Sequence, residues 1–189
     1  MAEGAGAALD DLMVLNCAEA LIDDALHLKC TSLALGPEWT TDRHVLLAHN
    51  EAWWPQDEHT LYLIHAEPEH EPPILALTYG GLLPAIGLNA AGLAQCCDSV
   101  YPDDSRVGVP RAFVARSVLG ASDLAEAGRR AAHPRREAGY NHLVVNRAGE
   151  ILSLEASALQ HAALPDTAGA LVHTNHYLDP AMRQVERDP

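Results

Sequence analysis

The sequence predicts a layered α+β domain in which antiparallel sheets pack against helices. Short β-rich runs fill the stretch from 30 to 97, two helical segments follow, and strands return after residue 139. A doubly wound sheet would instead alternate strands and helices along the chain, so this order favours layered sheets. At 189 residues the chain fits one domain, which would bury roughly 70% of its unfolded surface.

The first expected element is a helix. Apolar residues recur at helical spacing from Leu9 to Leu28, and Asp10 and Asp11 suit the first turn because carboxylates stabilise a helix N-terminus. Cys17 falls on the apolar face of this helix, where a cysteine usually acts as a small buried hydrophobe.

Six strands are expected next, because short apolar runs are separated by turn signals such as Gly36-Pro37 and Gly80-Gly81. The expected strands are Thr31–Leu35, His44–His49, Leu61–His65, Ile74–Tyr79, Ala85–Asn89 and Leu93–Cys97. Cys96 and Cys97 are adjacent in the last strand, so their side chains should point to opposite faces of the sheet.

A helical pair separates these strands from a second group. Helices are expected at Pro110–Leu119 and Ser122–Ala132, with Ser122 as the N-cap of the second helix. The second group of strands is expected at Tyr140–Asn146, Ile151–Glu155 and Ala170–Thr174. We interpret residues 1–189 as a single domain truncated at both ends, with a helical segment at 1–29 and the sheet and helix layers at 30–189.

The composition excludes several classes of function. The formal net charge is −14 and the 12 basic residues are scattered, whereas nucleic-acid binding needs clustered Lys and Arg. The same charge disfavours anionic membrane surfaces. No apolar run approaches the ~20 residues that span a bilayer, and the N-terminus lacks the pattern of a signal peptide. We therefore expect a cytoplasmic protein.

Cys30 is the candidate nucleophile. It follows the helical segment and begins a strand, a position that packing alone does not explain. A papain-type cysteine would begin a helix, where the helix dipole stabilises the thiolate. A cysteine that begins a strand instead fits a nucleophile that becomes the first residue of a processed chain. Cleavage between Lys29 and Cys30 would free an α-amine of pKa ~7.7–8.0, which can accept the thiol proton.

Five motifs follow Cys30 in an informative order. They are His49-Asn50-Glu51, Gly80-Gly81-Leu82-Leu83-Pro84, Gly87-Leu88-Asn89-Ala90-Ala91-Gly92-Leu93-Ala94, Gly139-Tyr140-Asn141-His142 and His173-Thr174-Asn175-His176. Together with Cys30 they resemble the acyl-coenzyme A:6-aminopenicillanate acyltransferase family, the C45-type N-terminal-nucleophile (Ntn) hydrolases. The resemblance covers nearly the whole chain and implies a four-layer αββα sandwich.

The resemblance also implies a mechanism. Cys30 would release itself from Lys29 by autoproteolysis and then form a thioester acyl-enzyme, which water or an amine resolves. Asn141 would donate its side-chain amide to the oxyanion, and a backbone N–H close to Ala52 would be the second donor. Thr31 would either bond the scissile carbonyl or fill a strand position. Other polar residues of the motifs are expected to support the site, namely His49, Asn50, Glu51, His173 and Asn175. Glu155, a carboxylate at a strand end outside the motifs, is expected to support it as a loop anchor.

Ala52 departs from the family pattern, because relatives carry an aspartate there that assists the nucleophile. Glu51 is not expected to replace it, since adjacent strand residues face opposite sides. Asp57 or Glu58 would have to fold back to supply a carboxylate. Relatives also carry a catalytic arginine beyond the His173–His176 run, to which no residue here is assigned. A catalytically silent Ntn-fold protein that binds an acyl or peptide-like ligand is therefore the alternative function.

A metal-dependent hydrolase is the third hypothesis. It is disfavoured because the i, i+3 spacing of His173 and His176 in a strand would send their rings to opposite faces, whereas zinc motifs set such pairs on one helix face. No metal or cofactor is expected, although acyl-coenzyme A could be a co-substrate. A small-molecule amide or thioester is the expected partner. Trp53, Trp54 and Tyr79 could line an acyl-binding cleft or simply pack the sheet, and the oligomeric state does not follow from the sequence.

Overall fold

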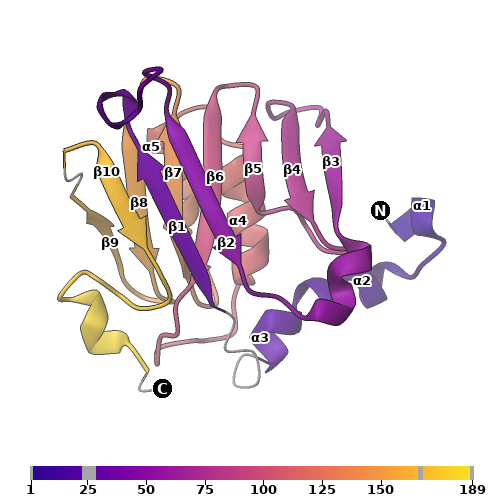
Figure 1. The fold of residues 1–189 in the computed structure, drawn as a ribbon. Helices are drawn as coiled ribbons and strands as arrows, with labels where there is room; N and C mark the ends of the chain where they lie inside the picture. Colours follow the sequence, from indigo (N-terminus) through magenta and orange to yellow (C-terminus); the bar gives the residue numbers. More distant parts are fainter. Residues whose placement is uncertain (1, 23–28, 166–167, 188–189) are drawn as a thin grey trace.

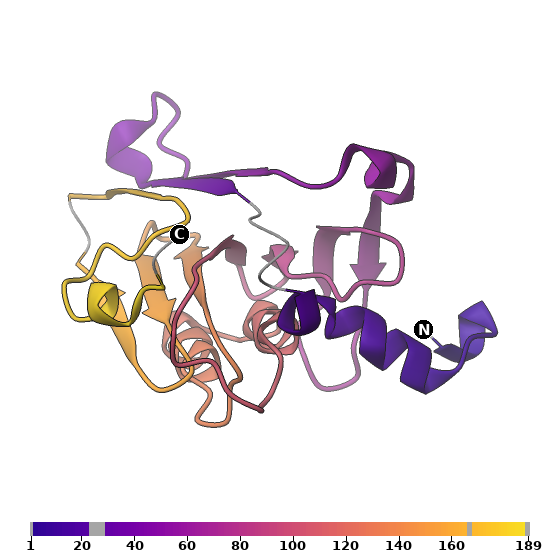
Figure 2. The ribbon, with the colours of Figure 1, turned by 90° about the horizontal axis from the view of Figure 1, so that it is seen from below.

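The computed structural model describes residues 2–22, 29–165 and 168–187. Two antiparallel sheets pack face to face, and Figure 1 shows the shorter sheet in front of the longer one. The short sheet has the strand order β10-β1-β2, and the long sheet has the order β3-β4-β5-β6-β7-β8-β9. Helices α4 and α5 cover the outer face of the long sheet (Figure 2). The expected α+β class with antiparallel sheets is confirmed, and these described residues form sheet, sheet and helix layers in that order.

The strands are β1 (Cys30–Leu35), β2 (Leu46–Glu51), β3 (Tyr62–Ala66), β4 (Ile74–Thr78), β5 (Ile86–Asn89), β6 (Leu93–Ser99), β7 (Tyr140–Asn146), β8 (Ile151–Ala156), β9 (His161–Leu164) and β10 (Ala170–His173). The α-helices are α1 (Ala2–Ala5), α2 (Leu9–Asn16), α3 (Ala18–Ile22), α4 (Arg111–Leu119) and α5 (Leu124–Ala131). The described residues also form the 3-10 helices η2 (Pro37–Trp39), η3 (Pro55–Thr60) and η4 (Met182–Val185).

The core lies in two layers on either side of the long sheet. Ala34, Cys96, Leu143 and Leu171 pack between the two sheets. A second group, which includes Val118, Ala127, Val144 and Leu154, packs between the long sheet and helices α4 and α5. Alternation along β6 places Cys96 in the first layer and Cys97 under α4, so the expected divergence of the two cysteines is confirmed.

The N-terminal helix differs from the expectation. α2 ends at Asn16, half-buried Cys17 is its C-cap, and α3 begins at Ala18. Long-range contacts fix this end, because the Asn16 side chain donates to the Gly81 carbonyl at 2.9 Å and accepts from the Leu83 N–H at 2.7 Å. Because Cys17 is only half-buried, the prediction of a buried Cys17 is wrong. The part of the expected helix between 23 and 28 lies outside the described residues.

The cap of α5 is one residue later than expected. The N-cap is Asp123, whose carboxylate accepts the Glu126 N–H at 2.7 Å, while the Glu126 side chain accepts the Ser122 N–H at 2.8 Å. These two hydrogen bonds resemble a capping box, in which the side chains of the N-cap and of the third helical residue each accept a backbone N–H. Asp123 therefore takes the place of the predicted Ser122 cap.

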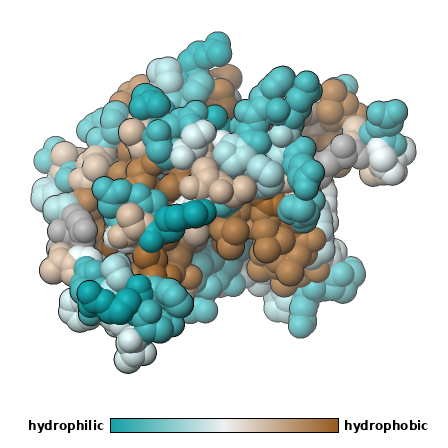
Figure 3. Space-filling model, turned by 90° about the horizontal axis from the view of Figure 1, so that it is seen from above, coloured by the Kyte–Doolittle hydropathy of each residue, from teal (hydrophilic) through white to brown (hydrophobic). Residues whose placement is uncertain are grey.

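Strands β3 to β5 extend beyond the edge of the short sheet. Leu63, Leu75, Leu77 and Leu88 lie on the face of these strands that points towards the short sheet, and they are 42–68% exposed. In Figure 3 hydrophobic surface is visible between hydrophilic projections when the molecule is seen from above. Among the described residues, no helix is both long enough and apolar enough to cross a membrane.

Candidate functional site

Cys30 is the first residue of β1 and is only 7% exposed. Its side chain faces the long sheet together with Ser32 and Ala34, whereas Thr31 is exposed on the other face. The Cys30 N–H donates to Asn175 Oδ1 at 2.5 Å. Asn175 in turn donates from Nδ2 to the Ser99 carbonyl at 2.9 Å, so the loop after β10 is tied to β6 beside the thiol.

The carbonyl on the other side of the Lys29–Cys30 peptide is also bound. The Lys29 carbonyl accepts the Ala52 N–H at a distance of 2.9 Å. This is an ordinary length for a backbone hydrogen bond, and the bond lies one residue beyond the Cys30–Glu51 pair of β1 and β2. Ala52 therefore contributes its backbone N–H, and not its side chain, to this end of the strand pair.

A cavity of about 330 Å³ opens beside Cys30. The ends of the strands form its upper wall, and α2 and α3, which lie below them in Figure 1, form its floor. Trp53, Trp54 and Tyr79 line the cavity, and the rings of Trp53 and Tyr79 stack with centroids 4.9 Å apart. Asp57 folds back, as its Oδ2 accepts the Trp53 Nε1–H at 2.8 Å. The cavity thus combines an aromatic wall with carboxylates.

Glu51 is the carboxylate next to Cys30. It is the register partner of Cys30 in the β1–β2 pair, so the two side chains share a face and line the same cavity. β2 continues two residues beyond its predicted end at His49, which aligns the two strands in this way. The expectation that Glu51 would face away from the nucleophile is therefore wrong. It rested on the opposite orientation of residues 51 and 52, whereas the pairing of β2 with β1 decides which of them shares a face with Cys30.

The environment of Glu51 raises its pKa to about 7. Although Glu51 is accessible from the cavity, the surrounding protein removes much of its hydration, and the charge of Glu19 adds repulsion. A hydrogen bond from Tyr79 partly offsets these effects. A carboxyl with a pKa near 7 can both accept and donate a proton at neutral pH, as general acid–base chemistry requires.

The Cys30 thiol is protonated at neutral pH. Burial, together with the charges of Glu51 and Asp98, raises its pKa to about 11, against hydrogen bonds from the Ser99 N–H and the Asn175 side chain. The two hydrogen bonds identify the donors that would stabilise a thiolate here. A reaction at this thiol would therefore need a base, and the nearest carboxylate across the strand pair is that of Glu51, the register partner of Cys30.

A second group of polar side chains lies between the sheets, on the inner side of Cys30. We call it the Asp98 cluster, and its members are Ser32, His49, Asp98, Asn141 and Ser153. The Asp98 carboxylate accepts the Ser32 hydroxyl at 2.7 Å and the Asn141 amide at 3.1 Å. Ser153 donates to Asn141 Oδ1 at 2.7 Å. Asn141 is thus fully buried with its side chain bonded to Asp98 and Ser153, and the amide in contact with Cys30 is that of Asn175.

His49 belongs to this cluster and is neutral. Its Nδ1 lies 2.9 Å from Ser32 Oγ, and because the Ser32 hydrogen goes to Asp98, His49 Nδ1–H is the donor in this pair. Burial lowers the pKa of His49 to about 4. His49 therefore orients Ser32 and is unsuited to carry a proton to or from Cys30.

Glu155 anchors the loop that contains Asn175. Its carboxylate accepts the Leu178 N–H at 2.5 Å, the Asp179 N–H at 3.0 Å and a hydrogen bond with His173 Nε2 at 2.7 Å. β10 ends at His173, so strand alternation does not extend to His176. The two histidine rings stack with centroids 6.5 Å apart, and the expectation that they face opposite sides is wrong for this reason.

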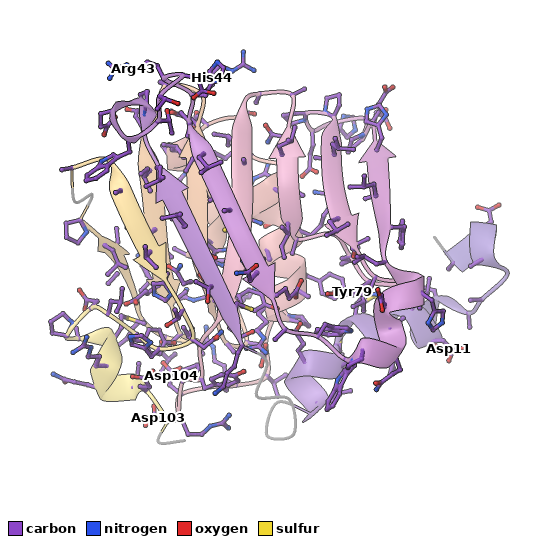
Figure 4. All side chains as sticks on the ribbon, viewed as in Figure 1. Asp11, Arg43, His44, Tyr79, Asp103 and Asp104 are labelled. Atoms are coloured by element: carbon purple, nitrogen blue, oxygen red, sulfur yellow. The ribbon has the colours of Figure 1, made fainter. Side chains whose placement is uncertain are left out.

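The outer positions of the motifs lie away from the cavity. Thr31 and Asn50 are paired across β1 and β2 and are both exposed on the outer face of the short sheet. Figure 4 shows Tyr79 at the lower end of the long sheet, near α2, and Arg43 and His44 at the opposite end of the short sheet. The candidate site is therefore confined to one end of the sandwich.

Two residues of the site, Glu19 and Arg111, had no signal in the sequence, and Tyr140 was noted only as part of the motif around Asn141. Glu19 of α3 reaches into the cavity, where Arg111 Nε donates to it at 2.7 Å and the Tyr140 hydroxyl forms a second hydrogen bond. Arg111 begins α4 and Tyr140 begins β7, so three separate elements meet here. Only the tertiary fold brings them together, because no local pattern marks residues that are far apart in the chain.

A family model, described as acyl-coenzyme A:6-aminopenicillanic acid acyl-transferase, matches residues 39–189, a range that begins after Cys30 and includes Glu51, Asn141 and Asn175. No curated protein matches the chain. Because the family model covers well over half of the sequence, the chain belongs to the acyl-coenzyme A:6-aminopenicillanic acid acyltransferase family.

Proposed function

We propose that this chain is a self-processing cysteine Ntn hydrolase that cleaves an amide or transfers an acyl group through a Cys30 acyl-enzyme. Membership of the family supports an acyltransferase or hydrolase in general. The observation that carries the finer proposal is the environment of the Lys29–Cys30 peptide. Its carbonyl accepts the Ala52 N–H, its N–H donates to Asn175, and Glu51 is in register with Cys30.

The first reaction would be autoproteolysis. Glu51 accepts the thiol proton, and Cys30 Sγ attacks the Lys29 carbonyl, whose developing negative charge the Ala52 N–H stabilises. The C–N bond breaks, the nitrogen of Cys30 takes up a proton, and Lys29 is left as a thioester on Cys30 Sγ. Water hydrolyses the thioester, which releases the Lys29 carboxylate and leaves Cys30 with a free α-amine beside Asn175 Oδ1.

The second reaction would use the processed residue. The α-amine accepts the thiol proton near neutral pH, and the thiolate attacks an amide or thioester. The Ser99 N–H and the Asn175 side chain, which both contact the sulfur, stabilise the negative charge. The aromatic wall formed by Trp53, Trp54 and Tyr79 suits an apolar acyl group. Water then completes a hydrolysis, or an amine accepts the acyl group; acyl-coenzyme A is a candidate donor in the second case.

Intact-mass spectrometry of the purified full chain tests the first reaction. We expect two fragments divided between Lys29 and Cys30 in the native protein, and one uncleaved chain in Cys30→Ala. Acylation of the native protein by a panel of amides and thioesters should add mass only to the fragment that begins with Cys30. An uncleaved native chain that also gains no acyl mass would refute the proposal.

The alternative is a catalytically silent protein that binds an acyl or peptide-like ligand. It is favoured by the alanine at position 52 and by the raised pKa of the Cys30 thiol, which disfavours spontaneous reaction. Ala52→Asp separates the two hypotheses. If only the Ala52→Asp protein is cleaved, the natural chain is a disabled relative. If the natural chain is already cleaved, processing does not need an aspartate at position 52.

A further inference from the structure

The segment that precedes the candidate cleavage site occupies one end of the cavity. Leu15 and Asn16 of α2 and Ala18 and Glu19 of α3 line the space that also contains Cys30. Of these, only Glu19 carries a charge. Its carboxylate is 21% exposed and points to a buried cation and a phenol rather than to solvent.

The partners of Glu19 form a built site for a carboxylate. The Arg111 side chain is only 4% exposed, and its Nε donates to Glu19 Oε2 at 2.7 Å. The Arg111 guanidinium lies 4.8 Å from the centroid of the Tyr140 ring, and the Tyr140 hydroxyl bonds the same carboxylate oxygen. A guanidinium fixed over an aromatic ring beside a hydroxyl donor is preorganised for a carboxylate, because little side-chain freedom is lost when the anion binds.

The charges elsewhere in the cavity favour one orientation of a ligand. Glu51 and Asp57 lie beside the aromatic wall of Trp53 and Tyr79, where a second carboxylate would be repelled. Tyr140 and Ala112, the neighbour of Arg111, line the other part of the wall. An anionic group should therefore bind at Arg111, and an apolar group at the aromatic wall.

We propose that Arg111 and Tyr140 form a subsite for the carboxylate of the substrate, and that Glu19 occupies this subsite as an internal competitor. This inference rests on the proposed function, because it assigns a substrate class to the same cavity: amides, thioesters or acyl acceptors that carry a carboxylate. Cleavage after Lys29 would end the covalent attachment of Glu19 to the rest of the chain. A carboxylate from solution could then replace it.

The test uses binding alone, in a full-length Cys30→Ala background that can neither cleave nor acylate. The probes are phenylacetate and phenylacetamide, which have similar shapes and differ in charge, and isothermal titration calorimetry measures their affinities. Glu19→Gln should increase phenylacetate affinity at least ~10-fold, because the neutral amide loses the charged hydrogen bond to Arg111 and competes only weakly for it. The affinity for phenylacetamide should stay the same within about twofold.

Asp57→Asn is the matched control, since it removes a cavity carboxylate that does not contact Arg111. Because it also removes a charge that repels an anion, it should raise phenylacetate affinity slightly, but far less than Glu19→Gln does. Tyr140→Phe and Arg111→Met, each added to Glu19→Gln, should abolish the gain; the tyrosine variant keeps the test decisive if the buried arginine cannot be replaced without unfolding.

Two results would overturn the carboxylate subsite. One is equal binding of the two probes, or binding of neither, in Glu19→Gln. The other is a gain in Asp57→Asn as large as that in Glu19→Gln, which would reflect general charge only. Because the readout does not involve Cys30, failure of this inference and failure of the proposed processing are distinguishable.

Discussion

Two groups of acids flank Cys30, and their surroundings differ. In the Asp98 cluster, between the sheets, each oxygen of a fully buried carboxylate accepts a hydrogen bond. In the cavity, Glu51 is accessible, lies close to a second carboxylate and has a pKa near 7. Both regions therefore contain a carboxylate next to Cys30. That of Asp98 is held by hydrogen bonds from neutral donors, whereas that of Glu51 can gain or lose a proton near neutral pH.

The difference shows how a small site can separate stability from reactivity. The Asp98 cluster joins β1, β6 and β7 through side-chain bonds, so it fixes the spacing of the two sheets beneath Cys30. The cavity acids Glu51, Asp57 and Glu19 instead line an open space and do not join the two sheets. We therefore expect changes in the cluster to affect folding, and changes in the cavity to affect proton transfer and ligand binding.

The largest effect is expected from Asp98→Ala. The substitution leaves the Ser32 hydroxyl and the Asn141 amide buried without their acceptor, which should lower the free energy of unfolding by about 2–4 kcal/mol. Urea unfolding followed by circular dichroism measures this change. Glu51→Gln is the comparison variant and should not lose stability, because glutamine lacks the charge that the folded state disfavours. Equal losses in the two variants would contradict the division between cluster and cavity.

Glu51→Gln should instead slow self-cleavage. Loss of a general base typically costs 10²–10⁴ in rate, and an effect of about 10²-fold is expected here. The measurement is a time course of Lys29–Cys30 cleavage after cell-free synthesis, quenched in acid and read by mass spectrometry. Asp57→Asn, which removes the carboxylate bonded to Trp53, should cleave at the native rate. If both variants slowed equally, the overall charge of the cavity and not Glu51 itself would matter.

The pH dependence of cleavage sharpens the same comparison. Glu51 acts as a base only when it is ionised, so the rate in the native chain should rise with pH and level off above about 7. The rise should be absent in Glu51→Gln. An identical pH profile in both proteins would assign the titration to another group.

The stability of the fold should depend on pH in the opposite direction to the cleavage rate. The folded chain holds the Glu51 proton more tightly than the unfolded chain, whose pKa is near 4.5. The stabilising contribution of Glu51 is therefore fully present below pH 4.5 and is lost as the pH rises through about 7. Comparison of urea midpoints of native and Glu51→Gln proteins from pH 4 to 8 measures it. Midpoints that diverge in the opposite direction would show that the folded state favours the ionised form.

The fold was more predictable from the sequence than the site, for a physical reason. Alternating apolar residues and turn signals are local, and they located most strands and both central helices. β9 was missed because His161–Leu164 is short, small and partly exposed. The position of Glu51 depended on two more residues of β2 and on its pairing with Cys30, and the position of Asn175 depended on the anchoring of a loop by Glu155. Such relations between distant segments leave no local pattern.

The smallest effect is expected from Thr31→Val, which tests the last of the roles left open by the sequence. Thr31 follows the nucleophile directly, but its exposed side chain points away from the cavity while Cys30 points into it. Valine keeps the β-branched shape that suits an exposed strand position, so stability should change by no more than about 0.5 kcal/mol. Cleavage at Lys29–Cys30 should proceed at the native rate. A slower cleavage without a loss of stability would contradict this. It would mean that the Thr31 hydroxyl bonds the scissile Lys29 carbonyl after rotation of the chain around Cys30, and that the Ala52 N–H is not the principal donor to that carbonyl.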